Sequence, residues 1–305
     1  MGNENYKKLG IIGGLGPAAT ATLFARVIDL TEAETDQDHL DITILNRPQT
    51  PDRTAFILGK SDESYLPPLH EAALELENLG CEVLATPCVT GHYRSDEWAA
   101  GLQTAHLVHM PRETARYLAL AGKRCVGIMA TDGTGHARVL QSELEACGLK
   151  AVLPDAENQA KVMSIIYDDV KRGRPANMRA FDEVSAHLRE QGCDSVILGC
   201  TELSVINAPA KSHGMVVVDA MEVLAIRSVQ ECDAPVKWDH TALDNVYGDS
   251  ASERFDDVSL GPLIIMFRKE FCGNENDMAR RQTRVFRRGD MRDFVRFACG
   301  RHGCA

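Results

Sequence analysis

The sequence predicts an α/β fold with two similar, doubly wound parallel-sheet subdomains, related by a pseudo-two-fold axis and enclosing an active site between them. Short apolar runs alternate along the chain with amphipathic stretches of helix length. The apolar runs are β-branched-rich and unbroken, which is typical of strands buried on both faces of a parallel sheet. The second part of the chain also repeats the pattern of the first, so we expect two halves built alike.

Each expected strand is one of these apolar runs. In order they are LGIIGG (9–14), LDITILN (40–46), CEVLATPC (81–88), CVGIMAT (125–131), KAVLP (150–154), DSVILGC (194–200) and MVVVD (215–219). Two of the stretches between them have clear helix signals, because residues 66–80 and 178–192 carry apolar stripes and end in glycine. In the first of these helices the stripe consists of Leu69, Ala72, Ala73 and Leu76.

Composition excludes several classes of protein. The chain has 305 residues, of which 44% are hydrophobic, enough for a sizeable core. No apolar run approaches the ~20 residues of a membrane span, and the N-terminal sequence lacks the apolar region of a secretory signal, so we expect a cytoplasmic protein without membrane contact. A net charge of -11 argues against general nucleic-acid binding. The ten cysteines show neither a C-x-x-C pair nor zinc spacing, and no metal is expected.

The internal repeat sets the expected domain organisation. LGCEVLATPCVT (79–90) aligns without a gap to QGCDSVILGCTE (191–202), and LGIIGGLGP (9–17) aligns to CVGIMATDGT (125–134). From this we assign residues 1–106 and 209–235 to a first subdomain, 107–208 to a second, and 236–305 to a C-terminal extension.

The repeat places Cys88 and Cys200 at equivalent strand ends, where open α/β sheets bind ligands. One thiol on each side of a small ligand suits inversion of a stereocentre beside a carboxylate, since a thiolate can remove the proton from one face while a thiol delivers one to the other. Such a pair needs no cofactor, and one thiol must be ionised while the other is not. The alternative is that both are ordinary core cysteines at strand ends.

The loop GGLGPAAT raises the question of a nucleotide site. Gly14 and Gly16 fit the G-x-G-x-x-[GA] fingerprint. A dinucleotide enzyme should carry an acid at the end of the second strand, but that strand ends in Asn46 and Arg47. Pro17 suits the first turn of a helix, so we expect the loop to present free N–H groups as an anion cradle. A tight turn without a ligand is the alternative.

Several ordered motifs together resemble the aspartate/glutamate racemase family, the cofactor-independent amino-acid racemases, and most closely its aspartate racemase branch. The resemblance covers roughly residues 8–230. The motifs are GIIGGLGPAAT, NRPQTPDRTAFILG, PCVTGH, ATDGT, IIYDDVKRG and GCTELSVI. The family implies two α/β subdomains with the active site between them, a small amino-acid substrate, no cofactor and commonly a homodimer.

The resemblance also implies roles for individual residues. Cys88 and Cys200 would be the two acid/base thiols. The other implied site residues, beside the loop glycines Gly14 and Gly16, are the basic Arg53 and Lys171, the hydroxyl-bearing Thr90, Thr131, Thr134 and Thr201, and Val89 and Glu202.

Each of these positions also has an ordinary interpretation. Arg53 could clamp a side-chain carboxylate or be a surface loop arginine, and Lys171 lies in KRGR, typical of a solvated helix end. Glu202 could orient a thiol, accept the substrate ammonium group or cap a turn. His92 could hold a residue of the site in place without contacting the substrate, or be a structural histidine.

One position departs from the family. Where the family usually has Cys-Asn-Thr, this chain has Cys88-Val89-Thr90, which replaces an amide that donates and accepts hydrogen bonds with a hydrocarbon. The pocket could therefore use another donor, accept a different amino acid, or turn over its substrate slowly.

The extension is strongly basic. Residues 280–301 hold eight arginines and two acidic residues, and arginines at four-residue spacing predict an amphipathic helix lying on the acidic body or on a neighbouring subunit. RNA or membrane-surface contact is the alternative.

The favoured function is racemisation of aspartate, glutamate or a related amino acid. The alternatives are a related cysteine isomerase or decarboxylase, and a non-catalytic ligand-binding or regulatory protein on the same scaffold.

Overall fold

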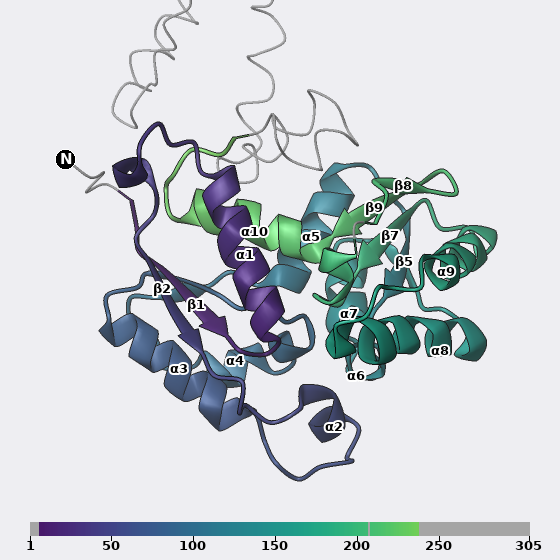
Figure 1. The fold of residues 1–305 in the computed structure, drawn as a ribbon, viewed down its shortest axis with the longest axis horizontal. Helices are drawn as coiled ribbons and strands as arrows, with labels where there is room; N and C mark the ends of the chain where they lie inside the picture. Colours follow the sequence, from purple (N-terminus) through teal and green to yellow (C-terminus); the bar gives the residue numbers. More distant parts are fainter. Residues whose placement is uncertain (1–5, 207, 238–305) are drawn as a thin grey trace, which may run out of the picture. The chain divides into compact units, whose positions relative to one another are not determined.

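The computed structural model describes residues 6–206 and 208–237. Figure 1 shows the two sheets and their flanking helices. Apart from Val236 and Lys237, the predicted extension and its basic helix lie outside the described residues.

The first sheet is parallel and lies in the N-terminal half. Its strands are β1 (Leu9–Gly13), β2 (Ile42–Asn46), β3 (Val83–Ala85) and β4 (His106–Leu107). They are ordered β2-β1-β3-β4. The central β1 is buried along its whole length, as its unbroken apolar run predicted.

The second sheet has the same topology with one added edge strand. Its strands are β5 (Cys125–Met129), β6 (Lys150–Val152), β7 (Ser195–Leu198), β8 (Lys211–Ser212) and β9 (Met215–Asp219). The order is β6-β5-β7-β9-β8, with only β8 antiparallel. Because β6-β5-β7-β9 matches β2-β1-β3-β4, the predicted fold class of two similar parallel-sheet halves is confirmed.

Two glycines aligned by the repeat have the same packing role in the two sheets. A Cβ atom at Gly10 of β1 would lie 2.7 Å from Leu84 Cδ2, and one at Gly127 of β5 would lie 2.8 Å from Leu188 Cδ1. Both distances are shorter than any real Cβ contact, so each central strand needs glycine where a leucine packs on it.

Ten α-helices surround the sheets in the described part of the chain. They are α1 (Pro17–Leu30), α2 (Arg53–Ile57), α3 (Leu66–Asn78), α4 (Ser95–Trp98), α5 (Met110–Leu120), α6 (Asp132–His136), α7 (Val139–Ala146), α8 (Ala156–Ser164), α9 (Met178–Glu190) and α10 (Ala220–Glu231). The predicted stripe of α3 is buried as expected. A π-helical turn (Ile165–Asp169) follows α8. None of the described helices is both long and apolar enough to span a bilayer.

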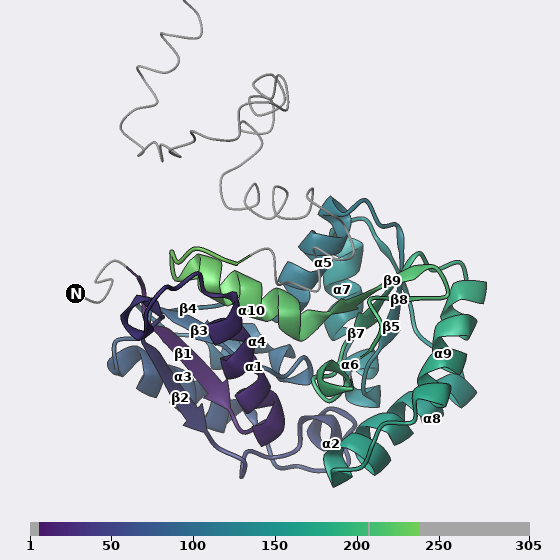
Figure 2. The same cartoon turned by 45° about the horizontal axis from the view of Figure 1, so that its top comes forward.

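The last helix of each half crosses to the other half. Helix α5 follows β4 but packs against α7, whereas α10 follows β9 but packs against α1 and α5. Figure 2 shows α10 alongside α1. The sequence assigned 209–235 as one piece to the first subdomain, but β8 and β9 are hydrogen-bonded into the second sheet and only α10 packs on the first half. The division therefore falls between β9 and α10.

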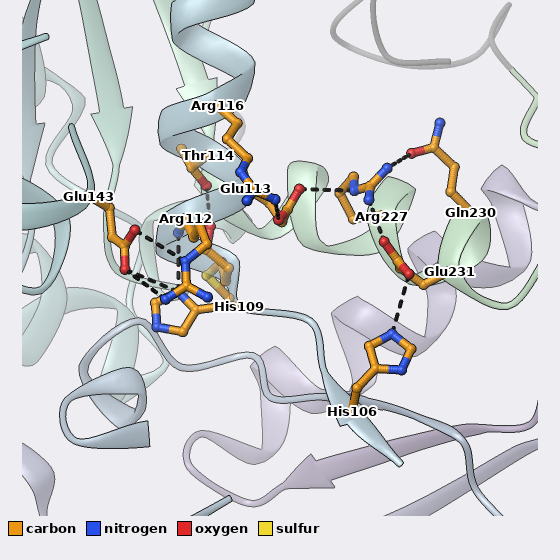
Figure 3. A network of polar contacts seen from close by, with 11 residues as sticks. His106, His109, Arg112, Glu113, Thr114, Arg116, Glu143, Arg227, Gln230 and Glu231 are labelled. Atoms are coloured by element: carbon orange, nitrogen blue, oxygen red, sulfur yellow. Dashed lines mark hydrogen bonds and ion pairs between the residues drawn. The ribbon is translucent and has the colours of Figure 1, made fainter. Parts of the chain in front are cut away.

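A buried ion pair joins the two crossing helices (Figure 3). Arg227 Nε of α10 lies 3.0 Å from Glu113 Oε2 of α5, and these side chains are 6% and 10% exposed. Arg116 donates to the other oxygen of Glu113 at 2.8 Å. Arg227 also pairs with Glu231, which lies 3.3 Å from His106 at the edge of the first sheet. The network therefore connects elements of both halves.

Candidate active site

Cys88 and Cys200 line one cavity between the two halves. Cys88 follows β3 and Cys200 follows β7, at the carboxyl ends of equivalent strands. Each cysteine is 7% exposed. The cavity encloses about 20 Å³ for water-sized molecules, which is room for little more than one water.

Arg53 places a positive charge beside Cys88. Its side chain hydrogen-bonds the Cys88 side chain. Burial opposes the charge, but Cys88 and Asp52 outweigh burial and raise the pKa of the Arg53 guanidinium.

The guanidinium of Arg53 also donates hydrogen bonds to backbone carbonyls. Nη1 donates to the carbonyls of Thr50 and Pro51 at 3.3 and 3.0 Å, and Nη2 donates to the Leu15 carbonyl at 2.8 Å. The sequence suggested a bidentate clamp for a carboxylate. In the structure its Nη atoms connect the loop at Leu15 to the loop at Thr50 and Pro51, and the carboxylate clamp stays a prediction.

Cys200 has the opposite environment. Its Sγ donates to Glu202 Oε2 at 2.9 Å, and Glu202 Oε1 lies 2.6 Å from Lys171 Nζ. Burial, followed by the Glu202 carboxylate, raises the pKa of the Cys200 thiol well above its usual value. Lys171 Nζ also lies 5.3 Å from the centre of the Tyr167 ring. Cys200 is therefore a protonated thiol in this arrangement.

A cluster of threonine hydroxyls lies beside the cysteines. Thr90 Oγ1 is 2.8 Å from Thr134 Oγ1 and 3.3 Å from Thr131 Oγ1. Thr131 Oγ1 also receives a hydrogen bond from Thr54 of α2 at 3.4 Å. Thr90, Thr131 and Thr201 line the cavity, whereas Thr134 is fully buried behind it. The cluster bridges both halves with groups that can donate to a carboxylate.

The glycine loop contributes less than the sequence suggested. Gly14 N–H donates to Thr20 Oγ1 at 3.0 Å, so this N–H is already bonded, contrary to the expected anion cradle. Gly14 has φ 89°, and a Cβ there would lie 2.4 Å from the Arg47 backbone. Gly16 has φ 155° and lies against Glu202, whose Oε1 is 3.4 Å from the position of a Gly16 Cβ. Neither glycine lines the cavity.

The structure adds lining residues that the sequence did not single out: Leu15, Asp52, Thr54 and Tyr167. Asp52 accepts a hydrogen bond from Ala55 N–H and so caps α2. Tyr167 belongs to the motif IIYDDVKRG, which was the available signal for it. Burial, ahead of all other causes, raises the pKa of the Tyr167 hydroxyl.

Val89 lies where the sequence departs from its family and lines the cavity. It is 2% exposed and also packs in the main hydrophobic core.

Across residues 6–206 and 208–237, no group of three or more His, Cys, Asp or Glu side chains is arranged to hold a metal ion.

Comparison with known proteins gives a consistent result. The family model described as Asp/Glu/Hydantoin racemase matches residues 12–227. The chain is 24% identical over 232 residues to the broad specificity amino-acid racemase RacX of Bacillus subtilis (strain 168), covering 72% of this chain and 96% of the relative.

Solved structures of similar fold include two archaeal proteins. Aspartate racemase of Picrophilus torridus is 27% identical with a TM-score of 0.66, covering 76% of this chain and 97% of the relative. An aspartate racemase homologue of Pyrococcus horikoshii OT3 is 24% identical with a TM-score of 0.62, covering 74% and 99%, and supports the fold.

Proposed function

The chain belongs to the Asp/Glu/Hydantoin racemase family, and on that premise we propose that it interconverts the enantiomers of an amino acid by a two-base transfer of the α-proton, using Cys88 and Cys200 and no cofactor. The observation that carries the proposal is the opposite surroundings of the two thiols in one cavity. The Arg53 guanidinium interacts electrostatically with Cys88, whereas the Glu202 carboxylate accepts a hydrogen bond from the Cys200 thiol.

The proposed reaction follows from this asymmetry. The Cys88 thiolate removes the α-proton from one face of the substrate, and the electron pair of the broken C–H bond delocalises into the α-carboxyl group. The Cys200 thiol then donates its proton to the opposite face of the α-carbon. After one turnover Cys88 is a thiol and Cys200 a thiolate, and the same two groups run the reaction in reverse.

Groups near Cys200 support both of its protonation states. Lys171 Nζ, 2.6 Å from Glu202, supplies a positive charge that favours the Cys200 thiolate. Glu202 accepts a hydrogen bond from the Cys200 thiol. Of the three roles that the sequence suggested for Glu202, this bond favours orientation of the thiol. Glu202 is also close enough to the Cys200 sulfur to pass on the proton that returns the thiolate to its thiol state.

We propose aspartate, glutamate or a related amino acid as the substrate. The hydroxyls of Thr90, Thr131 and Thr201 are the proposed donors to the α-carboxylate, and Arg53 and Lys171 supply the positive charge for an acidic side chain. The Val89 side chain offers neither a hydrogen-bond donor nor an acceptor. This favours a protein that accepts a broader range of amino acids or turns over its substrate slowly. The homodimer and the cytoplasmic location expected from the sequence stay predictions.

The test uses single-enantiomer amino acids in D2O, with α-deuteration followed by mass spectrometry and chirality by chiral chromatography. A racemase converts either enantiomer into a deuterated racemic mixture. Amino acids that bind without exchanging the α-proton would instead support the ligand-binding alternative. Complete retention of chirality with every acidic and neutral amino acid would overturn the proposal.

Single-cysteine variants test the two-base assignment. Cys88→Ala and Cys200→Ala should each abolish racemisation, while each still exchanges the α-proton of one enantiomer, opposite in the two variants. Cys81→Ala is the matched control, because Cys81 is fully buried outside the cavity; it should cost ~1 to 3 kcal/mol of stability at most. Racemisation at a near wild-type rate by either active-site variant would refute the mechanism.

A further inference from the structure

His92 links the backbone of Cys88 to the other half of the molecule. It lies in the 3-10 turn Thr90–His92 that follows Cys88, and its side chain is almost fully buried. Its Nδ1 is 2.9 Å from the Cys88 carbonyl oxygen, and Met110 N–H donates to its Nε2 at 3.2 Å. One imidazole ring thus bonds directly to a proposed catalytic residue and to the first residue of α5.

The two hydrogen bonds fix the tautomer of the ring. Met110 N–H can only donate, so Nε2 must accept and the proton of the neutral ring lies on Nδ1. The Nδ1–H group then donates to the Cys88 carbonyl. Burial, reinforced by His109, lowers the pKa of His92 to about 3, so the ring stays neutral at ordinary pH. His92 is consequently a fixed connection with one hydrogen-bonding pattern.

The far side of this connection is rigid. His109 caps the N-terminus of α5 by accepting from Arg112 N–H, and its ring packs edge-on against His92 with centroids 5.0 Å apart. Arg112 Nε of α5 donates to Glu143 Oε2 of α7 at 3.3 Å (Figure 3). Helix α5 is in turn paired with α10 through Glu113. His92 therefore anchors Cys88 to the packed helices that join the two halves.

We propose that His92 is a positioning residue for the Cys88 thiol. Its hydrogen bond to the Cys88 carbonyl sets the direction in which the thiol points toward the cavity and toward Cys200. The inference rests on the proposed function for its catalytic meaning, but the position of the thiol is a physical property that can be measured without substrate. Because proton transfer requires close alignment of donor and acceptor, a small displacement of Cys88 should slow transfer on one face of the substrate.

Two substitutions separate this role from simple space filling. His92→Asn places an amide N–H close to the position of Nδ1 and keeps a donor for the Cys88 carbonyl, although it leaves a cavity. His92→Phe keeps the ring volume but removes both hydrogen bonds. A positioning role predicts that Asn is tolerated and Phe is not; a packing role predicts the reverse.

The first readout is alkylation by iodoacetamide, followed separately for Cys88 and Cys200 by peptide mass spectrometry. The two thiols are equally exposed, so their rate ratio reports on Cys88 with Cys200 as internal reference. We expect His92→Phe to change this ratio by about tenfold, as for a lost hydrogen bond of ~1.4 kcal/mol, and His92→Asn to leave it within about twofold. An unchanged ratio in His92→Phe, or a larger change in His92→Asn, would overturn the proposal.

His187→Phe is the matched control. Its Nε2 also accepts from a backbone N–H, that of Asp155 at 3.4 Å, and neither residue lines the cavity. This variant should leave the ratio at the wild-type value. If His92→Phe does not fold, ¹⁵N spectra of the wild-type histidines decide: a His92 ring with its proton on Nε2, or one that titrates between pH 5 and 8, contradicts the inference.

Deuterium exchange then connects position to chemistry. In His92→Phe, exchange of the α-proton should fall for the enantiomer that Cys88 serves, identified from the Cys200→Ala variant, and remain for the other. Equal losses for both enantiomers would contradict a role specific to Cys88. If the wild-type protein exchanges no amino acid, the proposed function fails while the alkylation ratio still decides the role of His92.

Discussion

At the scale of single residues, Val89 is the side chain that we propose limits substrate recognition. It lines the cavity next to Cys88 but offers no hydrogen bond. We expect Val89→Asn to lower KM for aspartate or glutamate by about 10- to 150-fold, since a hydrogen bond to a charged group contributes ~1.5 to 3 kcal/mol. Steady-state kinetics measure the change, and Val89→Ala is the control because it enlarges the cavity without adding a donor.

The same substitution should reduce stability. Val89 is 2% exposed and packs in the core, so a partly satisfied amide there costs ~1 to 3 kcal/mol, measurable by urea unfolding. Kinetics that are identical in Val89→Asn and wild type would mean that position 89 does not contact the substrate.

The Cys200–Glu202 hydrogen bond gives a pH-dependent prediction. The negative carboxylate, together with burial, raises the pKa of the Cys200 thiol. In Glu202→Gln the charge is lost while an acceptor remains, so the pKa should fall and the thiolate should form at lower pH. Alkylation of Cys200 by iodoacetamide would then reach half of its maximal rate at lower pH than in wild type, with the partly exposed Cys147, which lies outside the cavity, as the internal control. A shift to higher pH would show that Glu202 does not hold the thiol protonated.

Residue patterns predicted the positions of the site better than the bonding within it. The repeat located Cys88 and Cys200 because strand ends can be recognised from apolar runs. The use of Arg53 as a fastener for Leu15 and Thr50 could not be predicted, since those carbonyls come from loops that meet only in the folded chain. The hydrogen bond from Gly14 N–H to Thr20 Oγ1 could not be predicted either. The glycine fingerprint describes only the spacing of glycines, and it does not show which N–H groups already donate to a side chain of the protein.

At the scale of elements, α2 contributes residues to the cavity and contacts α6 of the other half. Figure 2 shows α2, which belongs in sequence to the first half, beside α6 of the second. A Cβ at Gly133 of α6 would lie 2.9 Å from Thr54 Cα of α2. Because that neighbour is backbone, Gly133→Ala must push α2 away.

We expect Gly133→Ala to raise KM with a smaller effect on stability, since α2 has no buried residues of its own. Gly135→Ala in the same helix is the matched control: its nearest contact is Leu153 Cδ1 at 3.4 Å, an ordinary packing distance. Kinetics and thermal unfolding of both variants measure the difference. Equal KM values for the two would show that the fit of α2 against α6 does not govern substrate binding.

Long, buried elements were predictable and short ones were not. The strands β1, β5 and β7 and the helices α3 and α9 have clear apolar periods. Helix α2 spans five residues and depends on the Asp52 cap, too short for a periodic pattern. The edge strand β8 has two residues and depends on a turn in which His213 and Gly214 both have positive φ, a conformation that the sequence His-Gly only weakly indicates.

At the scale of the whole molecule, each half depends on a helix supplied by the other. The internal repeat predicted two similar halves, and in the structure α5 packs against α7 of the second half while α10 packs against α1 of the first. We therefore expect the halves to unfold as one cooperative unit, since neither crossing helix can leave without uncovering the core that both sheets share.

The last described residues are hydrogen-bonded to the segment that follows α1. Glu32 N–H donates to the Pro235 carbonyl at 3.0 Å, and Lys237 N–H donates to the Leu30 carbonyl at 2.7 Å. Val236 is 8% exposed in this contact. We therefore expect truncation after Lys237 to leave a soluble, folded protein with nearly unchanged cooperativity in thermal unfolding.

Truncation after Asp233 is the matched comparison, because it removes these two hydrogen bonds, the bond from Ala234 N–H to the Val229 carbonyl, and the buried side chains of Ala234 and Val236. It should lower stability by ~4 to 8 kcal/mol, the sum expected for three lost hydrogen bonds and the two buried side chains. Circular dichroism and urea unfolding of the two truncations measure the difference. If the chain ending at Lys237 fails to fold, residues after it supply core or interface; if it folds without racemising a substrate of the full chain, those residues act on the active site.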